Sequence, residues 1–245
     1  MIRTVFITGV LGGIGAATAR VFKEAGWHVA GMDQRPLPGA QTAVDQFLEG
    51  DLARADVGES LEKFIGSLDR LDAVVNNAAI QIKKPLHELS VAEWDQLFAA
   101  NLRSAFLVSR TAYGALARTT GCIVNVASVH AIATSPGMAA YAASKAALVA
   151  LTRSAALEMA EDGIRVNAVL PGAVDTPMLR AGVAQAASPE AALENLRLRT
   201  PLRRIAEPEE ISRVILFLAD GVAASYVTGQ TLIADGGALL RLGTE

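Results

Sequence analysis

The sequence alternates between short runs rich in β-branched residues and longer segments with helical periodicity. The expected strands cover residues 3–8, 28–32, 73–76, 122–127, 165–170 and 231–234. The expected helices cover residues 14–25, 61–68, 101–118, 141–160 and 208–219. This order is typical of a parallel sheet covered on both faces, and right-handed crossovers make it a doubly wound α/β sheet.

The alternation continues through the 245 residues without a linker or a repeat, which indicates one domain over residues 1–245. Residues 172–207 depart from the pattern, because they combine several prolines with a helix-prone stretch. We expect this segment to be a lid over a substrate pocket, with a plain surface excursion as the alternative.

Charge and composition exclude several classes of function. The net charge is −3 and no block of Lys and Arg occurs, so nucleic acid is not an expected partner. No apolar run is long enough to cross a membrane, and no His, Cys, Asp and Glu cluster has metal-ligand spacing. The single cysteine, Cys122, lies in an apolar run and is expected to be a buried, inert thiol. A cytoplasmic location fits these features.

A glycine-rich loop, residues 8–15, follows the first expected strand and opens the first expected helix. Glycines let the backbone turn sharply and approach a pyrophosphate, and a helix N-terminus offers free N–H groups to it. In this strand–loop–helix context the loop predicts dinucleotide binding, with an ordinary tight turn as the alternative. The loop residues expected to contact the cofactor are Gly9, Leu11, Gly13 and Ile14.

An acidic residue, Asp33, ends the second expected strand. There it can accept hydrogen bonds from ribose hydroxyls and repel a 2′-phosphate, which favours NAD over NADP. Arg35 follows two residues later and could still meet a phosphate, so NADP remains the less favoured cofactor. Asp51 and Leu52 are expected near the adenine, or otherwise in a simple turn.

Two adjacent amides, Asn76 and Asn77, close the strand at residues 73–76, and Ala78 follows them. Side-chain amides at a strand end can bond the neighbouring backbone. We expect this segment to shape the floor of the cofactor site rather than to form a bare turn.

Tyr141 and Lys145 lie four residues apart, with Ser128 upstream. On a helix, residues at this spacing share one face, so a phenol and an ammonium could serve one reaction centre. A nearby cation lowers the pKa of a phenol, and Ser128 could contribute a hydroxyl to the reacting oxygen. By itself the spacing also fits a chance pairing on a helix.

Taken in order, these motifs resemble those of the short-chain dehydrogenase/reductase family, in its standard-length, single-domain branch. The resemblance covers nearly the whole chain. It rests on Thr8-Gly9 to Gly15, Asn76-Asn77-Ala78, Asn101, Ser128, Tyr141 with Lys145, Pro171-Gly172 with Thr176, and Asp235-Gly236-Gly237. Ala79 is a small departure, since the family usually has Gly there. The resemblance implies a Rossmann fold, NAD(P) binding and a homotetramer.

The resemblance also implies roles for single residues. Tyr141 would be the general acid/base, and Lys145 would lower its pKa and hold the nicotinamide ribose. Ser128 would polarise the substrate oxygen, and Asn101 would fix a water that relays protons from Lys145 to solvent. Further cofactor contacts are implied for Asn77, Ala78, Pro171, Gly172, Val174 and Thr176.

Substrate clues are weaker. Gln81 and His130 are similar to a pair that binds the substrate carboxylate in 3-hydroxybutyrate dehydrogenases, but Met138 stands where those enzymes have lysine. Met138, Met178 and Leu179 indicate a partly apolar pocket instead.

Two further features bear on the substrate. Asp175 could bind a sugar or polyol hydroxyl, although capping of the following helix is the favoured interpretation. The basic end of the lid is interpreted as a solvated face rather than an anion site; it comprises Arg197, Arg199, Arg203 and Arg204.

The sequence therefore predicts an NAD-dependent oxidoreductase that interconverts a secondary alcohol and a ketone. A small hydroxy-acid or a sugar/polyol dehydrogenase is the alternative within that chemistry. From another class, a catalytically silent dinucleotide-sensing regulator could use the same fold, although such proteins usually lose the Tyr or the Lys.

Overall fold

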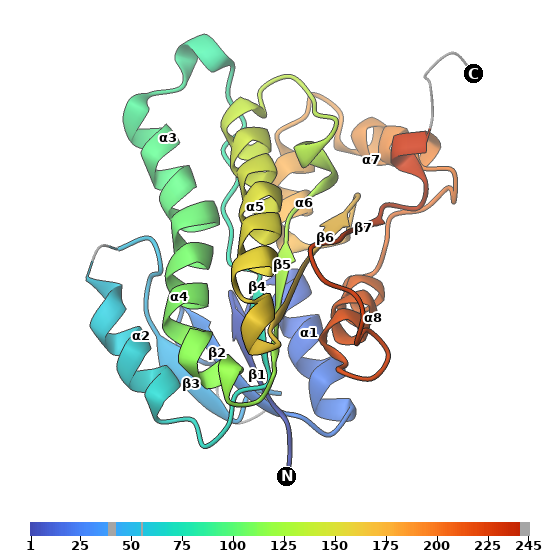
Figure 1. Ribbon diagram of the computed structural model, residues 1–245. Coiled ribbons are helices and arrows are strands. Elements are labelled where there is room, and N and C mark those ends of the chain that lie inside the picture. The colour runs from blue at the N-terminus through green and yellow to red at the C-terminus, as the bar shows by residue number, and fades with distance from the viewer. Residues whose placement is uncertain (39–42, 55, 241–245) are drawn as a thin grey trace.

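The computed structural model describes residues 1–38, 43–54 and 56–240, and its centre is a seven-stranded parallel sheet (Figure 1). The strand order is β3-β2-β1-β4-β5-β6-β7. The strands are β1 Thr4–Thr8, β2 His28–Asp33, β3 Gln46–Glu49, β4 Ala73–Asn76, β5 Cys122–Val126, β6 Arg165–Pro171 and β7 Thr231–Ala234. Because the order reverses between β1 and β4, the carboxyl ends of these two strands open a crevice for a ligand.

Helices cover both faces of the sheet, as the alternating sequence predicts. One layer holds α1 Gly13–Glu24 and α8 Pro208–Ala219, which pack against each other. The other layer holds α2 Val57–Gly66, α4 Ser104–Ala117 and α5 Ala139–Glu158 (Figure 1). Short 3-10 turns occur at Leu86–Glu88, Val129–Ala131, Ala160–Asp162 and Ala238–Leu240.

The core lies between the sheet and each helical layer. Phe22 and Trp27 meet edge to face, with ring centroids 5.0 Å apart, and pack on the side of α1 and α8. On the other side, Leu61, Leu116 and Ile123 are fully buried. Burial on both faces explains why the central strands read as continuous apolar runs.

Two elements are absent from the sequence prediction. Strand β3 has only four residues and is half-exposed at the edge of the sheet, so it lacks the apolar run that marks the inner strands. Helix α3, Val91–Phe98, begins with a capping box in which Ser90 and Glu93 exchange side-chain to backbone hydrogen bonds. That Ser-x-x-Glu pattern is a recognised helix start and could have located α3.

Helix boundaries also differ from the prediction. The helix expected to begin at residue 101 instead continues from α3 through a π-helical turn, Ala99–Arg103, into α4. The expected helices 61–68 and 141–160 are found as α2 and α5, shifted toward the N-terminus. No helix among the described residues combines the length and apolar character needed to cross a bilayer.

The segment 172–207 contains two helices, α6 Pro177–Ala184 and α7 Pro189–Arg199, above the strand ends. Thr176 caps α6, because its hydroxyl accepts the Leu179 N–H. The interpretation of Asp175 as the cap is therefore wrong. Asp175 instead forms a two-pronged ion pair with Arg180, at 2.7 and 2.8 Å.

The base of this segment rests on β7 and the turn that follows it. The Gly172 N–H donates to the Ala234 carbonyl at 3.0 Å, and the Leu202 N–H donates to the Gly236 carbonyl at 3.2 Å. A side chain at Gly172 would lie 2.8 Å from the Asp235 Cα, so only glycine fits there. The final strand thus supports both ends of the segment.

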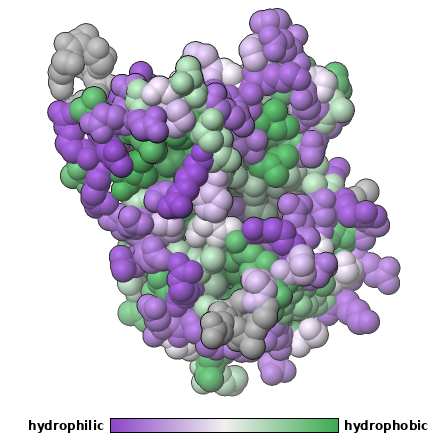
Figure 2. Space-filling model, turned by 180° about the vertical axis from the view of Figure 1, so that it is seen from behind, coloured by the Kyte–Doolittle hydropathy of each residue, from purple (hydrophilic) through white to green (hydrophobic). Residues whose placement is uncertain are grey.

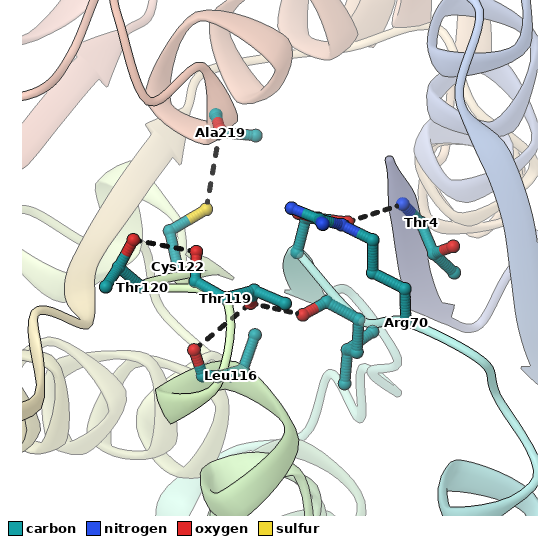
Figure 3. A network of polar contacts seen from close by, with 9 residues as sticks. Thr4, Arg70, Leu116, Thr119, Thr120, Cys122 and Ala219 are labelled. Atoms are coloured by element: carbon teal, nitrogen blue, oxygen red, sulfur yellow. Dashed lines mark hydrogen bonds and ion pairs between the residues drawn. The ribbon is translucent and has the colours of Figure 1, made fainter. Parts of the chain in front are cut away.

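A polar network joins the amino ends of β1, β4 and β5, at the end of the sheet opposite the crevice (Figure 3). Asp72 binds Arg70 and accepts the Thr4 N–H at 2.9 Å. Cys122 is buried there with its thiol directed at the Ala219 carbonyl, and burial raises the pKa of the thiol to about 11. The prediction that this thiol is buried is confirmed.

Candidate active site

A cavity of about 730 Å³ lies at the carboxyl ends of the strands and is bounded on one side by the segment 172–207. The face seen in Figure 2 is hollowed across its middle, with hydrophobic residues inside the hollow and hydrophilic residues on its rims. The cavity extends from the glycine-rich loop and β2 to α6 and α7. Its place at the switch point of the sheet is the usual ligand site of this architecture.

The glycine-rich loop is held by Asn77. The Asn77 side-chain amide donates to the carbonyls of Thr8 and Gly9 at 3.0 and 3.1 Å. Gly9 has a φ of +62°, and a side chain at Gly15 would lie 2.1 Å from the Gly9 carbonyl oxygen. Gly9 and Gly15 therefore have no room for a side chain, which leaves the backbone bare at these points of the loop, as a pyrophosphate requires.

The loop also touches the lid segment. A side chain at Gly13 would lie 2.6 Å from the Thr176 methyl group, and Gly13, Ile14 and Thr176 all line the cavity. Leu11 does not line it. Its backbone N–H donates to the Asp33 carboxylate at 3.0 Å, so the predicted cofactor contact of Leu11 is replaced by a contact that positions Asp33.

Asp33 ends β2, lines the cavity and is already occupied by its own neighbours. Besides the Leu11 N–H, its carboxylate accepts the Arg35 N–H at 3.1 Å and two guanidinium hydrogen bonds at 3.1 and 3.4 Å. This pairing holds the pKa of Arg35 above its usual value. A ribose diol would have to share or replace the Arg35 side chain at this carboxylate.

The other predicted nucleotide contacts also line the cavity. Asp51 accepts the Ala53 N–H at 2.8 Å, so it makes a turn and still faces the cavity, as does Leu52. The Thr8 hydroxyl accepts the N–H groups of Asn77 and Ala78, which fixes the floor expected from this segment. Of the other predicted cofactor contacts, Pro171, Gly172 and Val174 also line the cavity.

Tyr141, Lys145 and Ser128 meet at the centre of the cavity. Tyr141 and Lys145 lie on one face of α5, with the Lys145 Nζ 5.7 Å from the centre of the Tyr141 ring. Ser128 follows β5, and its side chain hydrogen bonds with Tyr141. The Lys145 ammonium donates to the Val126 carbonyl at 2.8 Å, which anchors it at the end of β5.

The pKa values of this group differ from expectation. Burial raises the pKa of Tyr141 to about 12, and the hydrogen bond with Ser128 only partly opposes that rise. Burial also lowers the pKa of Lys145, to about 8. Burial outweighs the lowering of the Tyr141 pKa that was expected from Lys145. The phenol is therefore protonated at neutral pH.

Asn101 lies in the π-helical turn and is 1% exposed. Its side chain accepts the Ile80 N–H at 2.8 Å and donates to the Ile80 carbonyl and the Ser144 hydroxyl at 3.0 and 3.1 Å. It thereby ties the loop after β4 to the helix that carries Tyr141. A water relay through Asn101 stays a prediction, since these contacts establish only a positioning role.

At the far end of the cavity, the lining includes Gln81, His130, Met178 and Leu179, as predicted. His130 meets the Tyr141 ring edge to face at 5.7 Å, and burial lowers its pKa. Met138 was expected in the same wall, but it is buried beneath Tyr141 and accepts a hydrogen bond from Gln81 at 3.3 Å. Helix α5 begins just after Met138, which directs this residue into the core.

Two residues of α7 and the residue that caps its C-terminus also line the cavity and were missed as substrate contacts: Leu196, Arg199 and Thr200. Their spacing of i, i+3 and i+4 places them on one face of the helix. That spacing was visible in the sequence, but Arg199 was grouped with three other arginines as a solvated face. In the structure, Arg199 lines the cavity and the other three arginines do not.

Comparison with known proteins identifies relatives along nearly the whole chain. Residues 9–238 match a family model described as enoyl-(acyl carrier protein) reductase. The chain is 37% identical to a 3-oxoacyl-[acyl-carrier-protein] reductase of Thermotoga maritima, over 96% of each protein. It is 39% identical to the 2,3-dihydro-2,3-dihydroxybenzoate dehydrogenase of Escherichia coli, over 97% of each.

A solved structure extends the likeness to three dimensions. The ligand-free aldohexose dehydrogenase of Thermoplasma acidophilum superposes with a TM-score of 0.92 at 30% identity, covering 100% of this chain and 96% of the other. All three relatives match this chain over at least 96% of their own length, although their names indicate three different substrates. Overall similarity therefore fixes the family and leaves the substrate to the lining of the cavity.

Proposed function

The chain belongs to the short-chain dehydrogenase/reductase family, and we propose that it is an NAD-dependent oxidoreductase interconverting a secondary alcohol and a ketone. One observation carries the proposal. The Tyr141, Ser128 and Lys145 group lines the same cavity as the glycine-rich loop and Asp33. A substrate oxygen at Tyr141 would therefore lie within the reach of a dinucleotide bound along the strand ends.

The chemistry divides between the cofactor and the chain. A bound nicotinamide ring supplies or accepts the hydride at the carbinol carbon. In ketone reduction, the Tyr141 hydroxyl gives its proton to the substrate oxygen, and in alcohol oxidation the proton moves back. Ser128 donates a hydrogen bond to the same oxygen, where negative charge develops.

Lys145 acts on Tyr141 through its charge. With a pKa of about 8, its ammonium is positive at neutral pH and favours the phenolate that remains after Tyr141 gives up its proton. The protonated phenol, with a pKa of about 12, is ready to donate without prior activation.

Asp33 supports the preference for NAD. A carboxylate at this place accepts ribose hydroxyls and repels a 2′-phosphate. Arg35 pairs with Asp33 and reduces that repulsion, so the preference is one of degree. NADP is the less favoured cofactor in this proposal.

The test assays a panel of secondary alcohols and ketones with NAD and NADP side by side. Turnover is measured as the change in absorbance of the reduced nicotinamide ring. Turnover with NAD is expected for part of the panel. Tight NADH binding without turnover of any member would instead support the silent, dinucleotide-sensing regulator. The intact Tyr141 and Lys145 pair favours the enzyme.

The sugar or polyol alternative loses its main support, because Asp175 is engaged with Arg180. Assembly into a homotetramer is part of the proposal, since the outer faces of α4 and α5 expose Phe106, Tyr113 and Leu157. Light scattering after size exclusion would test it, with a mass of four chains expected. A cytoplasmic location is also proposed, consistent with a single reduced cysteine.

A further inference from the structure

We propose that Arg199 is an anion anchor in the substrate end of the cavity, and that the substrate carries a carboxylate remote from its reacting carbinol. The inference rests on the proposed function, which it narrows from secondary alcohols to hydroxy acids with an apolar carbon skeleton. The observations behind it are the distribution of charge around the cavity, the partners of the arginines in and after α7, and the contacts that hold the last turn of α7.

The charges that line the cavity are unevenly distributed. Its carboxylates are Asp33 and Asp51, and both belong to the end where β2 and β3 terminate. Its cations are Arg35, which is paired with Asp33, Lys145, which is directed at Val126, and Arg199. Within the described part of the chain, the wall formed by α6 and α7 therefore presents one positive charge and no negative charge to the cavity.

Arg199 differs from its neighbours in its partners. Arg204 binds Glu210 at 2.6 Å and Arg197 lies 3.5 Å from Glu194, while Arg203 donates to a backbone carbonyl. Among the residues that the structure describes, the Arg199 side chain has no hydrogen-bond or ion-pair partner. Its guanidinium is exposed at the rim, so five donors remain for a ligand.

The backbone beneath Arg199 is firmly held. Thr200 is 6% exposed, its hydroxyl donates to the Leu196 carbonyl at 2.9 Å, and its N–H donates to the Arg197 carbonyl. Thr200 also packs against Gly236, where a side chain would lie 2.7 Å from its methyl group. The last turn of α7 is thus fixed on the turn after β7, with Arg199 projecting from a rigid base.

The surroundings specify the rest of the ligand. Leu196, Met178 and Leu179 form an apolar wall in the same part of the cavity, which fits a carbon skeleton. The carbinol group of the ligand would lie at Tyr141. A planar guanidinium binds a carboxylate through two parallel hydrogen bonds, and a single cation balances a single negative charge.

The experiment measures binding rather than turnover. Cyclohexanecarboxylate and cyclohexanecarboxamide have nearly the same shape and differ in charge, and each is titrated into the protein–NADH complex by calorimetry. The carboxylate is expected to bind about threefold to fivefold more tightly than the amide, as one exposed charged pair provides. Arg199→Gln should abolish that difference, and Arg199→Lys should keep part of it.

Arg197→Gln is the matched control, since it removes the same charge from the same helix at a position outside the cavity. It should leave the preference for the carboxylate intact. Equal binding of the two ligands, a preference that survives Arg199→Gln, or no binding of the carboxylate at millimolar concentration would each overturn the anchor.

The two proposals fail in different ways. If the carboxylate binds through Arg199 while no hydroxy acid or neutral alcohol is turned over, the anchor stands and the enzymatic proposal falls. If neutral alcohols are oxidised as well as their carboxylate counterparts and Arg199→Gln changes neither, the enzyme stands and the anchor falls.

Discussion

The two ends of the cavity are built in different ways. At the nucleotide end, Gly9, Gly15 and Asn77 interlock through backbone contacts, and Asp33 is bound by Leu11 and Arg35. At the substrate end, the walls are side chains, from α6 and α7 and from Gln81 and His130. One end is set by main-chain geometry, and the other by the choice of side chain.

This difference indicates how the two ends respond to change. Where backbone atoms meet, a single methyl group has nowhere to go, so the nucleotide end has little freedom to vary. Where side chains form a wall, substitutions alter shape and charge without moving the fold. Relatives that match over at least 96% of their length and are named for different substrates fit this division.

Tyr141→Phe should produce the largest effect, because Tyr141 stands where the two ends meet. Loss of the hydroxyl removes the proton donor, and kcat/KM for ketone reduction should fall by about a thousandfold. NADH affinity, measured by fluorescence titration, should hardly change. The control is Tyr113→Phe, which removes an exposed hydroxyl bound to Asp162. Activity that largely survives Tyr141→Phe would refute the assignment of the proton donor.

Gly15→Ala tests the rigidity of the nucleotide end. The added methyl would lie 2.1 Å from the Gly9 carbonyl oxygen, so the loop must shift. NADH affinity should fall by about a hundredfold, which corresponds to the loss of one or two charged hydrogen bonds.

Gly114→Ala is its control, since a methyl there on α4 meets nothing within 4 Å. That variant should bind NADH like the wild type. Equal affinities for Gly15→Ala and Gly114→Ala would remove the contrast between the two ends.

Asp33→Ala should reduce the NAD preference by about twentyfold, because both the ribose contact and the repulsion of a 2′-phosphate disappear. Arg35→Gln should act in the opposite direction, since it frees the Asp33 carboxylate and removes a cation. Dissociation constants for NADH and NADPH measure both effects. An unchanged ratio in Asp33→Ala would show that cofactor choice lies elsewhere.

The pH dependence should be the smallest effect. Lys145 is charged below its pKa of about 8 and neutral above it. Ketone reduction should therefore weaken as pH rises through about 8, by about tenfold between pH 7 and pH 9. Tyr141, with a pKa of about 12, keeps its proton throughout. A flat profile across that range would show that the charge on Lys145 is not needed.

The contrast between the nucleotide end and the substrate end of the cavity also explains which features the sequence could predict. The glycine-rich loop, Asn77 and the Tyr141–Lys145 pair were located, because each needs a certain residue type at a set distance from a strand or helix end. The short edge strand β3 carries no such requirement. Arg199 was grouped with its neighbours, because whether an arginine pairs depends on the approach of distant segments.

Three finer expectations failed for related reasons. Met138 enters the core because α5 begins immediately after it. Asp175 yields the cap of α6 to Thr176, and its own charge is taken by Arg180. The pKa of Tyr141 depends on how deeply α5 is buried, which residue spacing does not convey.

The support that β7 gives to the lid has a consequence for protein synthesis. A nascent chain that has left the ribosome through residue 230 contains β1 to β6, the glycine-rich loop and both lid helices. It still lacks Ala234 and Gly236, the carbonyls to which Gly172 and Leu202 donate. Because the chain is translated from the N-terminus, the nucleotide end can assemble before the segment 172–207 gains these two hydrogen bonds. The substrate end can therefore be completed only after β7 and the turn that follows it have been translated.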